Sequence, residues 1–231
     1  MKKYLKASNY IDYAKNKLVT YTKSYSQSGE DLILNNFFKY KNTGVYIDIG
    51  ANDPKKFNNT YFFYKKGWQG INIEPNIKKI ALLNKYRRKD LNLNLGAGSE
   101  RGVMNFYNFK PDTLSTFSEE IAKEYQSMGH TLKQIEKINV LPLKTILEKH
   151  LGNRKIDFLT IDTEGHDLDI LKSNDWTKYR PTYIIVETLE YKSDDSAKKI
   201  DDVFSEYLTS IDYAKAIDTY INTIYYDKKN V

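Results

Sequence analysis

The sequence predicts an α/β fold built on a mostly parallel seven-stranded sheet that ends in an antiparallel hairpin. Two observations carry this prediction. Short runs rich in β-branched residues alternate with helical stretches along most of the 231 residues, which is typical of βαβ crossovers and of a parallel sheet covered by helices on both faces. The last two strand-like runs are separated by only three residues, a connection that permits antiparallel pairing and not a parallel crossover.

The predicted elements follow one another in a simple order. Strands are expected at 44–49, 70–74, 91–95, 156–162, 183–187, 213–217 and 221–226, because the length of each run and its β-branched content favour a strand over a helix. Helices are expected at 57–66, 77–88, 143–150, 166–173 and 197–209. Parallel strands followed by a hairpin are the outline of a Rossmann-like class I methyltransferase fold.

One stretch between the third and fourth strands is too long for a simple crossover. Residues 99–155 are expected to contain a strand at 103–107, a loop at 109–117, a helix at 118–128 and a strand at 137–141. Insertions at the carboxyl edge of such a sheet usually shape the substrate pocket. We therefore predict one methyltransferase-like domain over 25–231 with a substrate-shaping insertion, preceded by a basic helical extension over 1–24.

The composition is that of a folded globular protein, with 40% hydrophobic and 29% charged residues, and it excludes intrinsic disorder. Cysteine is absent, which excludes disulfides, thiolate nucleophiles and cysteine-ligated zinc sites. The sequence shows neither an apolar run of about 18 residues, the minimum for a transmembrane helix, nor a secretory signal. A cytoplasmic protein is the simplest expectation.

The net charge of +6 is concentrated at one end of the chain. It results from 36 lysines and arginines and 30 acidic residues. Residues 1–25 hold six lysines and one aspartate, +5 in all, which leaves +1 (6 − 5) for the rest. A nucleic-acid-binding protein normally carries a basic stripe on its folded body, and a near-neutral remainder argues against one. The basic arm could contact an anionic membrane or an acidic partner, although a solvated helix is the simpler interpretation.

The turn after the first strand reads Asp48-Ile49-Gly50-Ala51-Asn52-Asp53-Pro54. A dinucleotide-binding turn would read GxGxxG, with glycines that let the backbone approach a pyrophosphate. Here one glycine remains, and the carboxylates of Asp48 and Asp53 would repel a pyrophosphate. A ligand without phosphate that carries a sulfonium and an ammonium group, such as S-adenosylmethionine, fits better. A capped strand–helix turn is the alternative.

Glu74 ends the second strand, 26 residues after Asp48. An acidic side chain at this place in a nucleotide-binding sheet accepts hydrogen bonds from both ribose hydroxyls. Pro75 and Asn76 then begin the next helix, in keeping with the preference of proline for a first helical turn. A lone Glu could be a helix cap, but together with the Asp48 turn it indicates a ribose site.

The fourth strand ends in Asp162-Thr163-Glu164-Gly165-His166-Asp167. The carboxyl ends of strands beside the topological switch point are where α/β proteins bind ligands. Gly165 relieves the turn, so Asp162, Glu164 and His166 are expected to converge on one cleft. Imidazole, with an unperturbed pKa of about 6.5, can take a proton from a hydroxyl near neutral pH. A solvent-facing histidine at the start of a helix is the alternative.

Together these motifs resemble the FkbM family of S-adenosylmethionine-dependent methyltransferases. Single motifs are not specific, but the set is, and the resemblance covers about 24–190 well and the C-terminal part more weakly. In one place the chain departs from the family, since Asp53-Pro54 replaces the commoner glycine and stiffens the turn. The matching stretches are 25–31, 46–54, 59–61, 67–76, 157–169 and 186–187, and the hairpin over 216–226 also fits.

The resemblance implies roles for individual residues around S-adenosylmethionine. It places Gln27 at the cofactor or the substrate lip, Gly50 and Asn52 at the methionine part, Asn59 and Thr60 at its carboxylate, Glu74 at the ribose, Gly96 and Ala97 beside the adenine, and Asp162, Glu164 and His166 at the methyl group and acceptor. Asp48 and Asp162 are also predicted to bind the cofactor.

The predicted function is an O-methyltransferase that acts on a hydroxyl of a small molecule, a sugar of a surface glycan or a related natural product. His166 is the predicted base, with Glu164 as the alternative. No metal is assigned, although carboxylates at 162, 164 and 187 could hold Mg²⁺. A metal-dependent sugar-nucleotide glycosyltransferase is the main competitor, because Asp167-Leu168-Asp169 has the DxD form, but a solvated helix face explains this motif as well. A catalytically inactive cofactor-binding module is the third alternative.

Overall fold

The computed structural model describes residues 22–39, 41–191 and 197–230. Most of the predicted N-terminal helical extension, 1–21, therefore lies outside the described residues. Among those that are described, no helix combines the length and apolarity needed to cross a bilayer.

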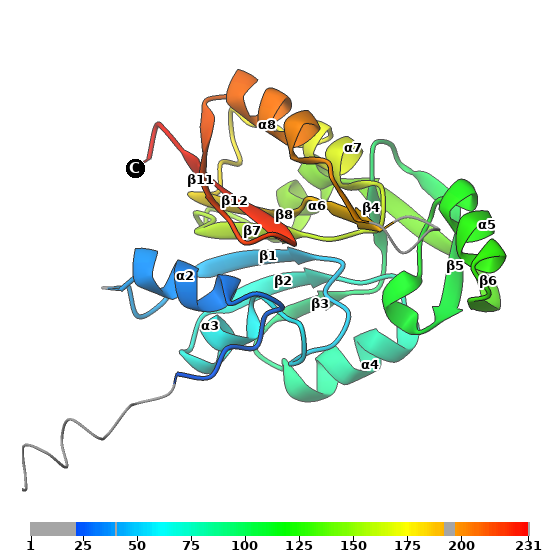
Figure 1. Ribbon diagram of the computed structural model, residues 1–231. Coiled ribbons are helices and arrows are strands. Elements are labelled where there is room, and N and C mark those ends of the chain that lie inside the picture. Colours follow the sequence, from blue (N-terminus) through cyan, green and yellow to red (C-terminus); the bar gives the residue numbers. More distant parts are fainter. Residues whose placement is uncertain (1–21, 40, 192–196, 231) are drawn as a thin grey trace, which may run out of the picture.

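Seven strands form the central sheet in the order β11-β12-β8-β7-β1-β2-β3, which confirms the predicted fold class (Figure 1). The five strands from β3 to β8 pair in parallel, and β12 pairs antiparallel with both β8 and β11. The order changes direction between β1 and β7, so ligands are expected at the carboxyl ends of these two strands. The strands are β1 (Val45–Ile49), β2 (Gln69–Ile73), β3 (Leu91–Leu93), β7 (Phe158–Ile161), β8 (Tyr183–Glu187), β11 (Tyr213–Asp218) and β12 (Asn222–Asp227).

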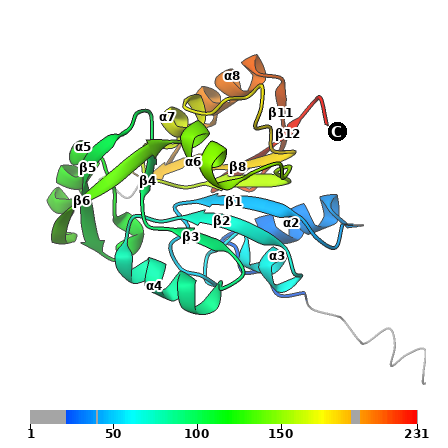
Figure 2. The same cartoon turned by 180° about the vertical axis from the view of Figure 1, so that it is seen from behind.

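Helices cover both faces of this sheet (Figures 1 and 2). On one face, α6 (Leu143–His150), α7 (Asp167–Lys172) and α8 (Asp201–Ser210) bury their apolar residues in a cluster with Ile47 and Ile161. On the other face, α2 (Glu30–Phe37) and α3 (Tyr61–Lys65) pack with Trp68 and Phe158, and α4 (Ile77–Tyr86) lies beside β3. Because side chains alternate between the two faces of the sheet along each strand, they pack into two separate hydrophobic cores.

The insertion forms a small second sheet in the order β4-β6-β5, made of β4 (Gly96–Gly98), β5 (Gly102–Lys110) and β6 (Thr131–Pro142). Between β5 and β6 lie a 3₁₀ turn over Asp112–Leu114 and the helix α5 (Glu119–Ser127). The predicted strands and helix of the insertion are thus present, with longer strands. β4 was not predicted, because its Gly-Ala-Gly sequence has no β propensity of its own. It forms a strand by pairing with β6.

Three predicted boundaries are wrong for local reasons. The first predicted helix starts later, at Tyr61, because Phe57 has a left-handed φ of 52° that a helix does not allow. The third strand stops at Leu93, since the Asn94 amide turns to donate to the carbonyls of Glu74 and Pro75. The helix predicted from 197 begins at Asp201, after β9 (Leu189–Tyr191) and β10 (Ala197–Lys199) pair as a short hairpin.

Candidate active site

The turn after β1 packs directly on the chain that leaves β7. Gly50 has φ 80°, and a Cβ on it would lie 1.8 Å from the carbonyl oxygen of Asp162. The Asp162 amide in turn donates to the Ile49 carbonyl over 3.1 Å. Only glycine permits this approach, so Gly50 joins the two loops that carry most of the predicted site residues.

Asn52 and Glu74 form a second link at this edge. The Glu74 carboxylate accepts from the amides of Asn52 (2.8 Å) and Asn76 (2.7 Å). Its burial raises the pKa of Glu74 to about 7. The Oδ1 of Asn52 is buried and accepts no hydrogen bond within the described chain. A buried orphan acceptor beside a carboxylate fits the ammonium and hydroxyl donors of S-adenosylmethionine.

Asp48 and Thr60 face the interior beneath this turn. The Thr60 hydroxyl donates to Asp48 over 2.7 Å and accepts from Arg87 over 2.8 Å. Arg87 also donates to Tyr46 and to the Pro54 carbonyl, and it pairs with Asp90 over 2.9 Å, with both side chains fully buried. The polar groups of Asp48 and Thr60 thus have protein partners, and their contact with the cofactor stays a prediction.

The remaining predicted cofactor residues lie in different surroundings. Asn59 donates to the Thr160 hydroxyl over 3.0 Å, and Gln27 is exposed in the turn before α2. A Cβ on Gly96 would lie 2.6 Å from the ring of Phe117, and Ala97 belongs to the apolar core. Phe117 therefore packs against Gly96, and contact of Gly96 and Ala97 with adenine stays a prediction.

Three carboxyl groups converge at the ends of β7 and β8. Oxygens of Asp162, Glu164 and Glu187 lie within 4.8 Å of one another, and all three residues are half-buried. Burial raises the pKa of each, the neighbouring charges raise those of Glu164 and Glu187 further, and Glu187 hydrogen-bonds to Asp162. The three carboxyl groups therefore keep their protons to a higher pH than exposed carboxyl groups do. The same oxygens are also ligands of the kind that Mg²⁺ accepts.

The insertion contributes a residue to this cluster. The Tyr125 hydroxyl, from α5, donates to Oε2 of Glu164 over 2.8 Å, and Thr116 donates to the Glu164 carbonyl. Glu164 itself has a left-handed φ of 53°, which is strained for a residue other than glycine. These contacts fix the orientation of the Glu164 carboxyl. The sequence prediction contained neither Tyr125 nor a catalytic role for Glu187.

His166 is not a member of this group of three carboxyl groups. It occupies the N-cap position of α7, and its ring meets that of Phe117 edge-on, with centroids 6.4 Å apart. Burial lowers the pKa of His166, and Asp169 opposes this shift. Its Nε2 is buried and has no hydrogen-bond partner in the part of the chain described. Asp162 and Glu164 thus converge with Glu187, whereas His166 lies beside Phe117.

The DxD motif does not present two carboxylates to one ligand. Asp167 is buried and accepts from the amide and hydroxyl of Thr163 over 2.9 and 2.7 Å, whereas Asp169 is exposed. Burial raises the pKa of Asp167 to about 7. The prediction of a solvated helix face is correct for Asp169 and wrong for Asp167, which caps the loop after β7.

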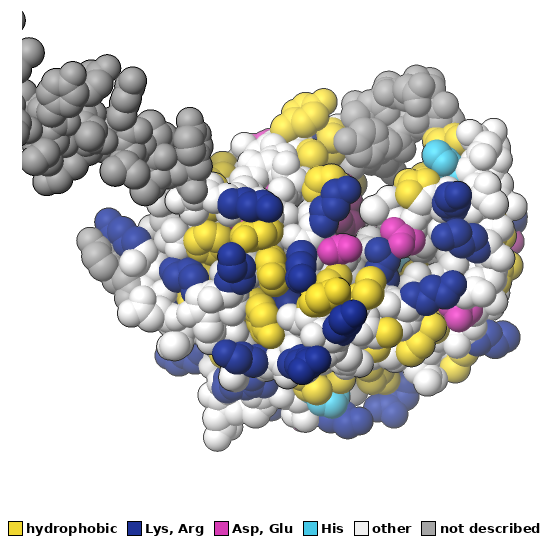
Figure 3. Space-filling view, turned by 90° about the horizontal axis from the view of Figure 1, so that it is seen from below, with side chains coloured by type: hydrophobic (Ala, Val, Ile, Leu, Met, Phe, Trp, Pro, Cys, Tyr) yellow, Lys and Arg dark blue, Asp and Glu magenta, His cyan; other side chains and the backbone are white. Residues whose placement is uncertain are grey.

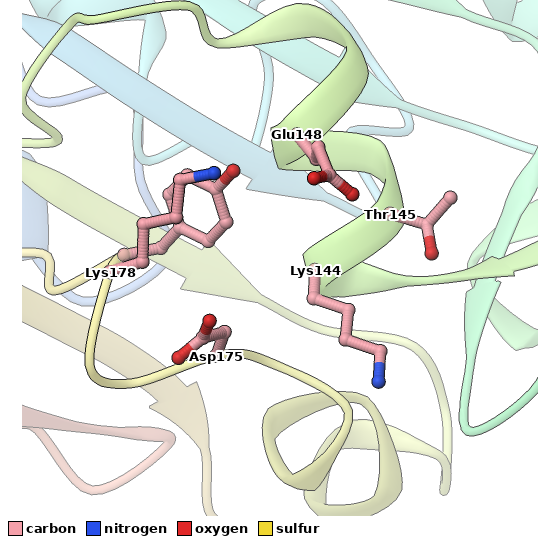
Figure 4. Close-up of a pocket in the computed structure, with 6 residues that line it drawn as sticks. Lys144, Thr145, Glu148, Asp175 and Lys178 are labelled. Carbon is pink, nitrogen blue, oxygen red and sulfur yellow. The ribbon is translucent and has the colours of Figure 1, made fainter.

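Two surface hollows contain none of the predicted site residues. One, of about 100 Å³, lies between α6 and 175–179 and is lined by charged residues such as Lys144 and Asp175 (Figure 4). The other, of about 340 Å³, lies between Asn94 and β6. The candidate site is therefore defined by the convergence of loops at the sheet edge.

The buried carboxyl groups predict how stability depends on pH. Glu74, Asp167 and Glu164 have raised pKa values in the folded protein, so the folded state binds protons that the unfolded state releases. Stability should therefore rise as pH falls from about 8.5 to about 6.5, by about 2 kcal/mol or about 4–8 °C in Tm. Below this window the lowered pKa values of His150 and His166 oppose the trend. Scanning calorimetry of the cofactor-free protein tests this, and a rising Tm toward pH 8.5 would contradict it.

The chain is similar to one protein family and, distantly, to solved methyltransferase structures. The model of the methyltransferase FkbM domain matches residues 48–214. A TehB-like SAM-dependent methyltransferase from Corynebacterium glutamicum aligns at 8% identity with TM-score 0.47, covering 96% of this chain and 97% of that one. An O-methyltransferase from Bacillus cereus in complex with SAH aligns at 11% identity with TM-score 0.44, covering 94% and 86%. No curated protein matches the sequence.

The family match spans both strand-end turns, the Glu74 site and the carboxyl cluster, and it covers more than half of the chain. Together with the seven-stranded sheet, it shows that the protein belongs to the FkbM methyltransferase domain family and is a methyltransferase that uses S-adenosylmethionine.

Proposed function

We propose that this enzyme methylates a hydroxyl oxygen of a small molecule, with a sugar as the acceptor class. The observation that carries the proposal is the cluster of Asp162, Glu164 and Glu187 at the sheet edge, next to the Gly50 turn. An alcohol holds its proton tightly, so its methylation needs a group that removes this proton. Carboxyl groups are also good partners for the several hydroxyls of a sugar.

The methyl donor supplies an electrophilic methyl group on a sulfonium sulfur. Asn52 and Glu74 would hold it, because their oxygens are acceptors at the carboxyl ends of β1 and β2. The contribution of the chain to the reaction is alignment of the acceptor oxygen with the methyl carbon and removal of the hydroxyl proton.

Glu164 is the base that we favour. Asp162 and Glu187 hydrogen-bond to each other, whereas the Tyr125 hydroxyl orients one oxygen of Glu164 and leaves the other oxygen to accept a proton. Its raised pKa makes its carboxylate a stronger base than an ordinary glutamate. His166 remains the alternative, supported by its lowered pKa and by its Nε2, which has no hydrogen-bond partner among the described residues.

The acceptor class can be tested directly. The enzyme is incubated with S-adenosylmethionine and a panel of monosaccharides, nucleotide sugars, phenols and matched amino sugars, and methylated products are located by mass spectrometry and NMR. Methyl ethers on sugar hydroxyls are expected. Transfer to nitrogen only, or to phenols only, would contradict the proposal.

Glu74 provides a test of cofactor binding. Glu74→Gln removes the negative charge and should weaken S-adenosylmethionine binding at least tenfold, because one charge-assisted hydrogen bond contributes about 1.5–3 kcal/mol. Titration calorimetry above pH 7 measures the affinity, and circular dichroism checks the fold. Asp53→Asn is the matched control, since the Asp53 carboxylate accepts from the amides of Lys55 and Lys56 in the same turn. Equal affinities for the two variants would reject the assignment of Glu74.

A further inference from the structure

We propose that one face of the enzyme docks on an anionic membrane surface. This surface, called the α4 face below, consists of the exposed side of α4 and the loop that precedes α3. Figure 3 shows the molecule from this side, with dark blue basic groups and yellow apolar groups interleaved and few acidic ones. The residues of the α4 face are Lys55, Lys56, Phe57, Ile77, Lys78, Leu82, Lys85, Tyr86, Arg88 and Lys89.

The charge of this face is strongly one-sided. Residues 77–89 contain six lysines and arginines and no acidic residue. Arg87 points inward to Asp90, and Lys79 pairs with Asp112. Among the described residues, the four other cations of this segment form no ion pair with a carboxylate. The near-neutral net charge predicted for the folded body therefore hides a local excess of positive charge.

Apolar side chains stand between these cations. Phe57 is 59% exposed, Ile77 52%, Leu82 37% and Tyr86 38%. Lys55 lies 3.7 Å from the centroid of the Tyr86 ring, which joins the loop to the helix as one surface. Single exposed apolar residues are common, but a cluster of them among unpaired cations is unusual.

This combination fits a lipid surface better than a nucleic acid. Helices that lie in the membrane interface carry lysines and arginines beside apolar residues, which enter the headgroup layer while the cations bind anionic headgroups. Nucleic acids use the same cations and stack on aromatic rings, but aliphatic groups such as Ile77 and Leu82 add nothing to backbone binding. The exposed aliphatic side chains of the α4 face therefore favour an anionic lipid surface over a nucleic acid as its partner.

The α4 face begins close to the cofactor edge. Ile77 is its first helical residue, and the amide of the preceding Asn76 donates to Glu74. Docking through α4 would therefore bring this edge of the sheet toward the headgroup layer. The inference depends on the surface alone and does not require the acceptor to be a sugar.

Vesicle sedimentation tests the proposal with the full chain. The protein should sediment with vesicles of equal parts phosphatidylglycerol and phosphatidylcholine, and not with pure phosphatidylcholine. The triple variant Lys78→Glu, Lys85→Glu, Arg88→Glu should bind the anionic vesicles at least about tenfold more weakly, because each cation near such a surface contributes to binding. Phe57→Ser with Leu82→Ser should weaken the binding that remains at high salt, where the electrostatic part is screened.

A matched control separates this face from general charge effects. Lys144→Glu, Lys149→Glu, Lys172→Glu makes the same change in net charge on α6 and α7, which cover the opposite face of the sheet. It should leave vesicle binding unchanged, and every variant keeps the lysines of the N-terminal arm. Absence of sedimentation, equal losses in both triple variants, or no loss in the α4 variant would overturn the proposal. Tighter binding of a single-stranded RNA oligonucleotide, abolished by the α4 variant, would overturn it in favour of nucleic acid.

Discussion

Glu164→Gln is expected to lower kcat by about 10²–10⁴, the usual contribution of a positioned general base. The amide cannot take the acceptor proton, but it keeps the size of the side chain and can still accept from Tyr125. Because the pKa of Glu164 is raised, the wild-type rate should increase with pH above neutrality as the base loses its proton. Steady-state kinetics at saturating cofactor measure both effects, and affinity for S-adenosylmethionine should change little.

His166→Ala is the comparison that decides between the two bases. If Glu164 is the base, this variant should lose less activity than Glu164→Gln at every pH. A greater loss in His166→Ala, relieved at high pH where the acceptor ionises unaided, would assign the proton transfer to His166. Loss of wild-type activity in EDTA with recovery in Mg²⁺ would instead assign Asp162, Glu164 and Glu187 to a metal ion.

Arg87→Met is expected to have the largest effect on folding. It leaves the buried Asp90 carboxylate without its ion-pair partner and takes donors from Tyr46, Thr60 and the Pro54 carbonyl. Breaking a buried pair in this way costs about 3–5 kcal/mol, which corresponds to a fall in Tm of about 6–20 °C for a chain of this size.

The neighbouring Arg88 supplies the control. Its side chain is exposed and, among the described residues, donates to the Lys85 carbonyl alone, so Arg88→Met should change the free energy of unfolding by less than about 0.5 kcal/mol. Urea denaturation followed by circular dichroism measures both variants. Equal stabilities would show that the Arg87 network contributes nothing to the fold.

The sheet could be predicted from the sequence because its strands are short apolar runs with a clear period. The predicted 183–187 strand coincides with β8, and the 143–150 helix coincides with α6. Elements without a local sequence signal were missed. β4 is stabilised by its neighbour β6, and no local property of Gly-Ala-Gly indicates a strand.

The site could be predicted only in part, because a strand-end motif does not reveal where each side chain points. Asp48 and Thr60 have the protein partners Asn58 and Arg87 beneath the turn, which the sequence did not indicate, and their contact with the cofactor stays a prediction. Arg87 itself stands in a run of basic residues that resembles a solvated helix end. The position of Glu187 at the end of a strand parallel to β7 was a usable signal for the carboxyl cluster.

The contact between Tyr125 and Glu164 has a consequence for how such an enzyme could diversify. Tyr125 belongs to the insertion, which we predict to shape the acceptor pocket, and its hydroxyl also orients the group that we propose as the base. Exchange of the whole insertion would therefore change both the choice of acceptor and the basicity of Glu164 in one step. Chimaeras whose replacement insertion has a hydroxyl donor at the position of Tyr125 should keep the wild-type turnover number. Chimaeras without this donor should require a second, compensating substitution near Glu164.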